Sequence, residues 1–171
     1  MKTLMNLLLL FCLPLCLTGQ SELFYDKEYT IAIYETVVCN IIDTGAVLRI
    51  EYYTEGDFIS NRFFYYGDEL NDYGKPVCDS MVEEYFCHEC VDFLLNMAIK
   101  KRPYQWRKMD DSTYLSKSRF LWNSSDEIIV LLMHIKYKPE EEVCLIITYT
   151  KQIMTREERR ETLKRLRKVR N

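Results

Sequence analysis

The chain has 171 residues, of which 48% are hydrophobic and 29% charged, and its formal net charge is −3 at pH 7. This length and apolar content suit one domain with its own hydrophobic core, and they exclude a small scaffold that depends on disulfides for its stability. The small net charge hides an asymmetry. Residues 156–171 carry eight basic and three acidic side chains, so a basic tail follows an acidic body.

The first twenty residues read MKTLMNLLLLFCLPLCLTGQ, with a lysine near the start, an apolar run and small residues at its end. This pattern is typical of a secretory signal peptide, and the apolar run is roughly half as long as a membrane span. We therefore predict a signal peptide over residues 1–19, a secreted α+β domain over residues 20–154 and a basic helical tail over residues 155–171. The mature protein is expected to be extracellular.

Strand patterns follow the predicted leader. Residues 29–39 are rich in β-branched and aromatic side chains, and residues 46–53 alternate between apolar and polar side chains. The link between these two segments contains the turn formers Asp43 and Gly45, so we expect a hairpin. Residues 62–66 are predicted to form a third strand.

A long helix is predicted next. Ser80 and Glu83 have the spacing of a capping box at a helix start, and Pro103 would help to end the helix. Between them, five apolar positions are spaced by four, four, three and four residues, which is the period of one helix face. These positions are Val82, Phe86, Cys90, Phe93 and Met97.

Strand patterns return after this helix, in residues 112–122, 127–138 and 143–149. The segment 127–138 has one continuous apolar side, and its other side becomes polar at His134. One end of this strand should therefore be covered on both faces and the other end solvated. The order of elements predicts an α+β fold, in which an antiparallel sheet of about five or six strands packs on one long central helix, with a basic C-terminal helix.

Export would modify one asparagine and most of the cysteines. Asn123 begins an N-glycosylation sequon in a predicted turn, so we predict a glycan there. Five cysteines follow the leader, and most should pair in an oxidising compartment. They are Cys39, Cys78, Cys87, Cys90 and Cys144. Because five is odd, one cysteine is left over, and it is either buried or joins two copies in a disulfide-linked homodimer.

The sharpest chemical motif is Cys87-His88-Glu89-Cys90. A redox centre would need an exposed cysteine at a helix start, and a zinc site would need a second pair of ligands. Residues three apart on a helix have β-carbons ~5–6 Å apart, whereas a disulfide needs ~3.5–4.5 Å. We therefore predict that Cys87 and Cys90 do not bond each other. Instead, Cys39 and Cys144 are expected to bridge to two of the three cysteines near the helix, with Cys78 left over.

The basic tail begins with a second candidate capping box, formed by Thr155 and Glu158, and has a thin apolar stripe that includes Leu163. Four interpretations are open for this tail, and one of them is that it binds the acidic body of the protein itself. The other three are a solvated helix, a contact for an anionic surface such as a glycosaminoglycan or an anionic lipid, and a segment that proteases remove. Arg159 and Arg170 each end an Arg-x-x-Arg spacing and are the predicted processing sites.

No familiar catalytic motif occurs, so we predict no enzyme, no catalytic residue, no cofactor and no metal site. The expected function is that of a secreted, disulfide-stabilised glycoprotein that binds an extracellular protein, a lipid or a small apolar ligand. Residues 67–78 and 102–108 are candidate contact sites because they contain tyrosine and tryptophan. Nucleic acid is not an expected partner. The alternatives are a secreted enzyme without a familiar motif and a precursor of a processed basic C-terminal peptide.

Overall fold

The computed structural model describes residues 21–37, 39–54, 57–100, 104–117, 120–121 and 127–168. The predicted leader (residues 1–19), Asn123 and Arg170 lie outside these ranges. The described elements, in chain order, are η1 (Ser21–Phe24), α2 (Lys27–Tyr34), β1 (Cys39–Asp43), β2 (Val47–Thr54), β3 (Asp57–Leu70), β4 (Pro76–Tyr85), η2 (His88–Cys90), α3 (Val91–Lys100), β5 (Arg107–Lys108), β6 (Thr113–Leu115), β7 (Phe120–Leu121), β8 (Glu127–Tyr137), β9 (Leu145–Thr155) and α4 (Arg156–Lys168).

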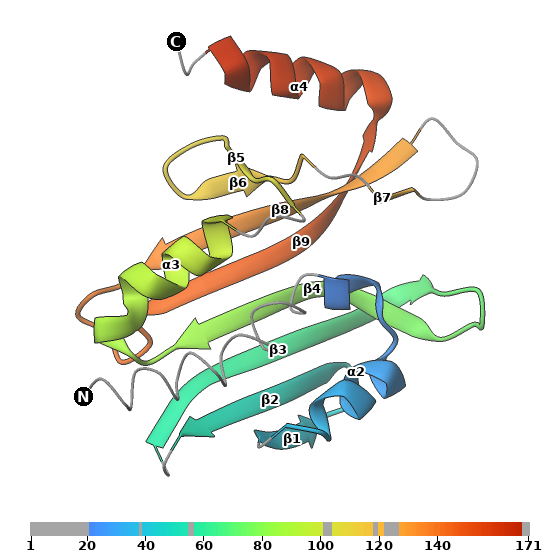
Figure 1. The fold of residues 1–171 in the computed structure, drawn as a ribbon. Coiled ribbons are helices and arrows are strands. Elements are labelled where there is room, and N and C mark those ends of the chain that lie inside the picture. The colour runs from blue at the N-terminus through green and yellow to red at the C-terminus, as the bar shows by residue number, and fades with distance from the viewer. Residues whose placement is uncertain are drawn as a thin grey trace.

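The described strands form one antiparallel sheet (Figure 1). Eight of them follow the order β1-β2-β3-β4-β9-β8-β6-β5, and β7 pairs with β8 beside this path. The turn between β1 and β2 holds Gly45 at φ 92°, a backbone conformation that glycine adopts without strain. β4 and β9 pair over six residues each, from Ser80 with Thr150 to Tyr85 with Leu145. The two halves of the sheet therefore meet along a short seam.

The predicted fold is wrong in its central element. Across the described ranges, nine strands and three short α-helices replace the five or six strands on one long helix. The residues expected to start that helix form β4, where Met81 and Glu83 are buried while Val82 and Glu84 are half-buried. A strand with one buried face alternates every two residues, and this pattern overrides the helical spacing of the apolar positions. Only the second part of the predicted helix is helical, as α3.

α2 replaces the first predicted strand. Asp26 caps this helix, because its side chain accepts a hydrogen bond of 2.9 Å from the backbone N–H of Tyr29. The buried residues of α2 are Thr30 and Tyr34, which are four apart and so lie on one face. The side chains of this segment favour a strand, but packing of its buried face against the core makes it helical. The predicted hairpin therefore forms between β1 and β2 instead.

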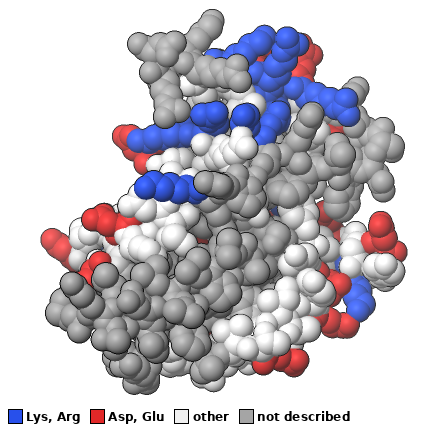
Figure 2. Space-filling view, in the orientation of Figure 1, with Lys and Arg blue, Asp and Glu red and all other residues white. Residues whose placement is uncertain are grey.

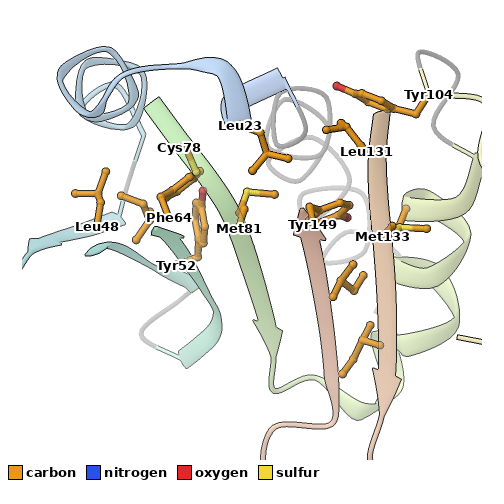
Figure 3. Packing of buried hydrophobic residues seen from close by; sticks show 14 of the residues in the cluster. Leu23, Leu48, Tyr52, Phe64, Cys78, Met81, Tyr104, Leu131, Met133 and Tyr149 are labelled. Carbon is orange, nitrogen blue, oxygen red and sulfur yellow. The ribbon is translucent and has the colours of Figure 1, made fainter. Parts of the chain in front are cut away.

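The core lies between one face of the sheet and the helices α2 and α3 (Figures 1 and 3). Five neighbouring strands contribute one side chain each to a row that crosses this face, and every member is almost fully buried. The row is Leu48, Phe64, Met81, Tyr149 and Met133. Because the row crosses the seam between β4 and β9, both halves of the sheet share one core.

The C-terminal strand pair is confirmed as β8 and β9, which pair along their full length. The first half of β8 is buried on both faces, and its second half is exposed on one face from His134 onward, as predicted. A second small core explains the covered end. Leu115, Ile128 and Val130 form this cluster, and Leu163 of α4 packs against it.

Candidate functional site

The cysteine motif forms a local cross-link. Cys87 and Cys90 are joined by a disulfide with their Cα atoms 5.3 Å apart, so the prediction that they do not bond each other is wrong. That prediction assumed a regular helix. Cys87 instead has an extended backbone (φ −94°, ψ 98°) and precedes the short 3₁₀ helix η2. The two side chains therefore do not have the fixed separation of one α-helical turn.

The cysteines expected to bridge the helix and the sheet have other environments. Cys39 and Cys144 are thiols, and burial raises the pKa of both above the ordinary value for cysteine. Neither has the depressed pKa of a reactive thiolate. Cys78 is buried in β4, where its Sγ donates to the carbonyl of Ser80 at 3.1 Å.

A buried ion pair lies at the centre of the core face. Arg62 of β3 and Glu83 of β4 are cross-strand neighbours, and their Nη2 and Oε1 atoms are 2.5 Å apart with side chains only 5% and 7% exposed. Arg62 also donates to the hydroxyl of Tyr34, and the Tyr149 hydroxyl donates to Glu83 Oε2 at 3.2 Å. The guanidinium carbon lies 5.6 Å from the ring centroid of Tyr52. These contacts enclose the pair, which points to a structural role.

The basic tail is anchored at its start by the predicted capping box. The Thr155 N–H donates to Glu158 Oε2 at 2.8 Å, and the Glu158 N–H donates to Thr155 Oγ1 at 3.1 Å. The backbone N–H and the hydroxyl of Thr155 both donate to the Glu158 carboxylate, and these two bonds hold the pKa of Glu158 below its ordinary value. They also direct α4 away from the end of β9 (Figure 1).

One side of α4 is docked on the body of the protein. The half-buried positions of the helix recur at i, i+3, i+4 and i+7, which is the period of one face. They are Arg159, Thr162, Leu163 and Leu166. Arg159 donates to the carbonyl of Lys117, and α4 contacts β5. The predicted processing site at Arg159 thus lies inside a docked helix.

Three exposed cations of α4 form a ridge beside this docked face. Arg156, Arg160 and Lys164 are spaced by four residues, so they follow one another along the helix. β5 adds Arg107 and Lys108, and the segment after β6 adds Lys117. We call these six residues the basic surface. Figure 2 shows Lys and Arg side chains gathered over α4 and the region of β5 and β6.

Most of this positive charge is not neutralised. Lys164 pairs with Glu161 at 2.7 Å and Lys108 pairs with Asp111 at 2.9 Å. The other four cations are Arg107, Lys117, Arg156 and Arg160, and none of them forms an ion pair with a residue that the structure describes. Clustered cations of one sign create a field that attracts anions. The sequence predicted the charge of the tail, but its position beside β5 follows only from tertiary packing.

No protein-family model, curated protein or solved structure matches this chain. Within the described ranges, no group of three or more His, Cys, Asp or Glu side chains is placed to hold a metal ion. None of the helices that can be described has the length and apolar character needed to cross a bilayer. The function is therefore argued from the chain's own surfaces.

Proposed function

We propose that this protein is a secreted binding protein whose basic surface binds a sulfated polysaccharide outside the cell. The observation that carries the proposal is the docking of α4 beside β5, which brings cations from distant parts of the chain onto one platform. Arginine supplies half of the basic surface, and its planar guanidinium donates two parallel hydrogen bonds to a sulfate or carboxylate group. Export and the glycan at Asn123 stay predictions, and the proposed location of the ligand depends on export.

A polysaccharide suits this surface better than a membrane does. A helix that lies in a membrane interface needs a free apolar face. The apolar side of α4 is already occupied, since Leu163 packs against Leu115, Ile128 and Val130. The exposed side therefore offers charge without an apolar face for lipid. An anionic polymer that lies along the surface of the protein needs exposed cations and no apolar face.

The spacing of the cations favours a polymer over a small anion. Arg156, Arg160 and Lys164 succeed one another every four residues, which is about 6 Å of rise along a helix. A chain with regularly spaced anionic groups meets several of these cations at once. A single sulfate ion meets one or two. Affinity should consequently rise with the length of the polysaccharide, because linked contacts add to one another.

The test is the salt dependence of heparin binding by the purified, exported protein. The double variant Arg156→Ala/Arg160→Ala removes two cations from the basic surface. Its matched control is Lys136→Ala/Lys138→Ala, which removes the same charge at the opposite end of β8. We expect the wild-type protein to bind heparin at about 0.15 M salt. The basic-surface variant should elute at lower salt and show a weaker salt dependence, because fewer counterions are released on binding.

Two results would contradict the proposal. The first is equal loss of heparin binding in both double variants, since the effect would then come from net charge and not from the basic surface. The second is retention on anionic lipid vesicles without retention on heparin, which would assign the surface to a membrane. If short heparin fragments bind as tightly as long ones, the spacing of the cations does not favour a polymer over a small anion.

A further inference from the structure

The Cys87–Cys90 disulfide lies where a strand passes into a helix. β4 ends at Tyr85, and η2 continues directly into α3, so the helical segment runs from His88 to Lys100 at one end of the sheet (Figure 1). Cys87 is the N-cap residue of this segment. A redox-active cysteine requires a position of this kind at the start of a helix. The structure therefore meets the condition that the predicted long helix excluded.

This disulfide does little to hold distant parts of the fold together. Its two cysteines are three residues apart, and a bond that closes so short a loop restricts the unfolded chain least. The cysteines that were expected to tie the helix to the sheet, Cys39 and Cys144, are thiols. Stabilisation of the fold is therefore a weak reason for a disulfide at this place.

The motif is open to solvent. Cys87 and Cys90 are half-buried, and the two residues between them, His88 and Glu89, are exposed. The Cys144 thiol, by contrast, is fully buried. Exchange between a thiol and a disulfide requires the attacking sulfur to reach one sulfur of the bond. The exposed turn of the motif leaves this bond accessible to a thiol of another molecule.

The position of Cys87 favours this residue as the sulfur that exchanges. The helix macrodipole and the N–H groups of the first turn stabilise a thiolate at the N-cap more than one inside the helix. Cys90 lies inside the first turn, three residues further on. Glu89 and Asp92 also lie near this helix start and oppose a thiolate there. Because both cysteines have these acidic neighbours, their difference in position decides which sulfur holds negative charge better.

Exposed aromatic side chains lie near the disulfide. Phe93 is 41% exposed and follows Cys90 by three residues on the same helical segment, so the two are neighbours on its surface. Tyr137 is 54% exposed, and it pairs with Leu145, which pairs in turn with Tyr85 at the end of β4. Two strand spacings, roughly 10 Å, therefore separate Tyr137 from the strand that leads into the motif. An extended polypeptide can pack against these rings while its thiols reach the disulfide.

We propose that Cys87–Cys90 is a redox-active disulfide that oxidises a pair of thiols in an extended, partly unfolded polypeptide. One substrate thiolate attacks Cys87 Sγ, the bond between the two cysteines breaks, and Cys90 leaves as a thiolate and takes up a proton. The second substrate thiolate attacks the substrate sulfur bound to Cys87 and releases Cys87, which is protonated in turn. The substrate loses two electrons and two protons and gains a disulfide, while this protein gains them as two thiols. The basic surface contains none of these residues.

The first test compares the native protein with the protein unfolded in urea. The purified full-length protein is mixed with a synthetic unstructured peptide that has two reduced cysteines flanked by aromatic residues. Acid stops the reaction, and mass spectrometry assigns the alkylated thiols. We expect native Cys87 and Cys90 to become reduced as the peptide is oxidised, at no less than about one tenth of the rate in urea, because the fold leaves the bond accessible. Cys39→Ser should react like the wild type. Reduction only in urea overturns the proposal, because the bond is then purely structural.

Two single-cysteine variants identify the sulfur that exchanges. Each has one thiol at the motif, so exchange is measured in the reverse direction, as formation of a mixed disulfide with the oxidised peptide. Cys90→Ser should react about twofold faster near pH 7 than Cys87→Ser, because the helix start raises the thiolate fraction and the lower basicity offsets part of that gain. A thermal melt shows that each variant is folded. Equal rates, or a faster reaction of Cys87→Ser, overturn the proposed route through Cys87.

A last comparison tests a polypeptide as the substrate. Phe93→Ala should slow reduction by the aromatic peptide about threefold, because an aromatic contact is lost, and should leave reduction by glutathione unchanged. Tyr73→Ala is the matched control, since Tyr73 is 86% exposed in the loop between β3 and β4, at the other end of β4. Equal slowing by Tyr73→Ala, or a peptide that reacts no faster than glutathione, overturns the choice of a polypeptide.

Discussion

Replacing Glu83 by leucine would leave the guanidinium of Arg62 without its carboxylate in the middle of the core face. The two side chains are 5% and 7% exposed, so water cannot take the place of the missing partner. Removing one member of such a buried pair destabilises a protein by about 3–5 kcal/mol. The Tyr149 hydroxyl would also lose the Glu83 acceptor that it contacts at 3.2 Å. We therefore expect Glu83→Leu to lower the free energy of unfolding by about 3–5 kcal/mol.

The double variant Arg62→Met/Glu83→Leu separates two causes of this loss. Replacing both charged groups by apolar ones of similar size removes the uncompensated charge, and such replacements are often neutral or stabilising. The double variant should thus be more stable than either single variant, with a coupling energy of at least about 2 kcal/mol. Urea unfolding followed by circular dichroism measures all four proteins. For a domain of this size, each kcal/mol shifts the Tm by about 2–4 °C, which gives a second readout.

One control variant and two possible outcomes test whether the buried charge causes this loss of stability. Glu141→Leu breaks the exposed ion pair with Lys138 and should leave the stability nearly unchanged. A loss below about 1 kcal/mol for Glu83→Leu would refute the reasoning, since a buried charge without a partner cannot be that well tolerated. So would a double variant whose loss equals the sum of the two single losses.

Two further predictions concern Asp79 of β4 and the cysteines. Asp79→Asn should raise the free energy of unfolding at neutral pH. Because the folded state raises the pKa of Asp79 above its ordinary value of 3.8, the native carboxyl favours folding when protonated and loses that advantage as the pH rises through its folded-state pKa. The stabilisation by asparagine should therefore disappear when the pH falls below the ordinary pKa of aspartate. Urea unfolding between about pH 3 and pH 7 measures this, and a variant that stays more stable than the wild type at the acid end would contradict the prediction. Cys87→Ala/Cys90→Ala should lower the free energy of unfolding by about 2 kcal/mol, since the closed loop is short. A peptide map without reduction should show Cys87 joined to Cys90. Cross-links from either residue to Cys39 or Cys144 would contradict the local disulfide.

The parts of the fold that the sequence predicted well are those with local signals. The alternation in residues 127–138, with its change at His134, predicted both the strand β8 and its two environments. The pair Thr155 and Glu158 predicted the start of α4, because a capping box uses residues only three apart. Pro103 follows closely after α3, which ends at Lys100.

The errors arise where distant residues decide the structure. Glu83 looks like a helix-capping residue until Arg62 pairs with it across the strand. The cluster of Glu69, Asp79 and Lys151 could not be predicted for the same reason, since these residues are far apart in the chain and each resembles an ordinary surface charge. Their proximity follows from the point at which β4 and β9 stop pairing. No pattern within a short window of sequence carries that information.

The short seam also determines how the chain assembles. β1 to β4 follow one another through short connections, and so do β8 and β9, so each half forms from neighbouring segments. The seam instead joins segments far apart: the Cys144 thiol meets the Tyr85 carbonyl across 59 positions of the chain. Closing this large loop costs more chain entropy than closing the short loops within each half. The six residue pairs of the seam and the shared core offset that cost. The two halves should therefore organise first, and their union should complete the native protein.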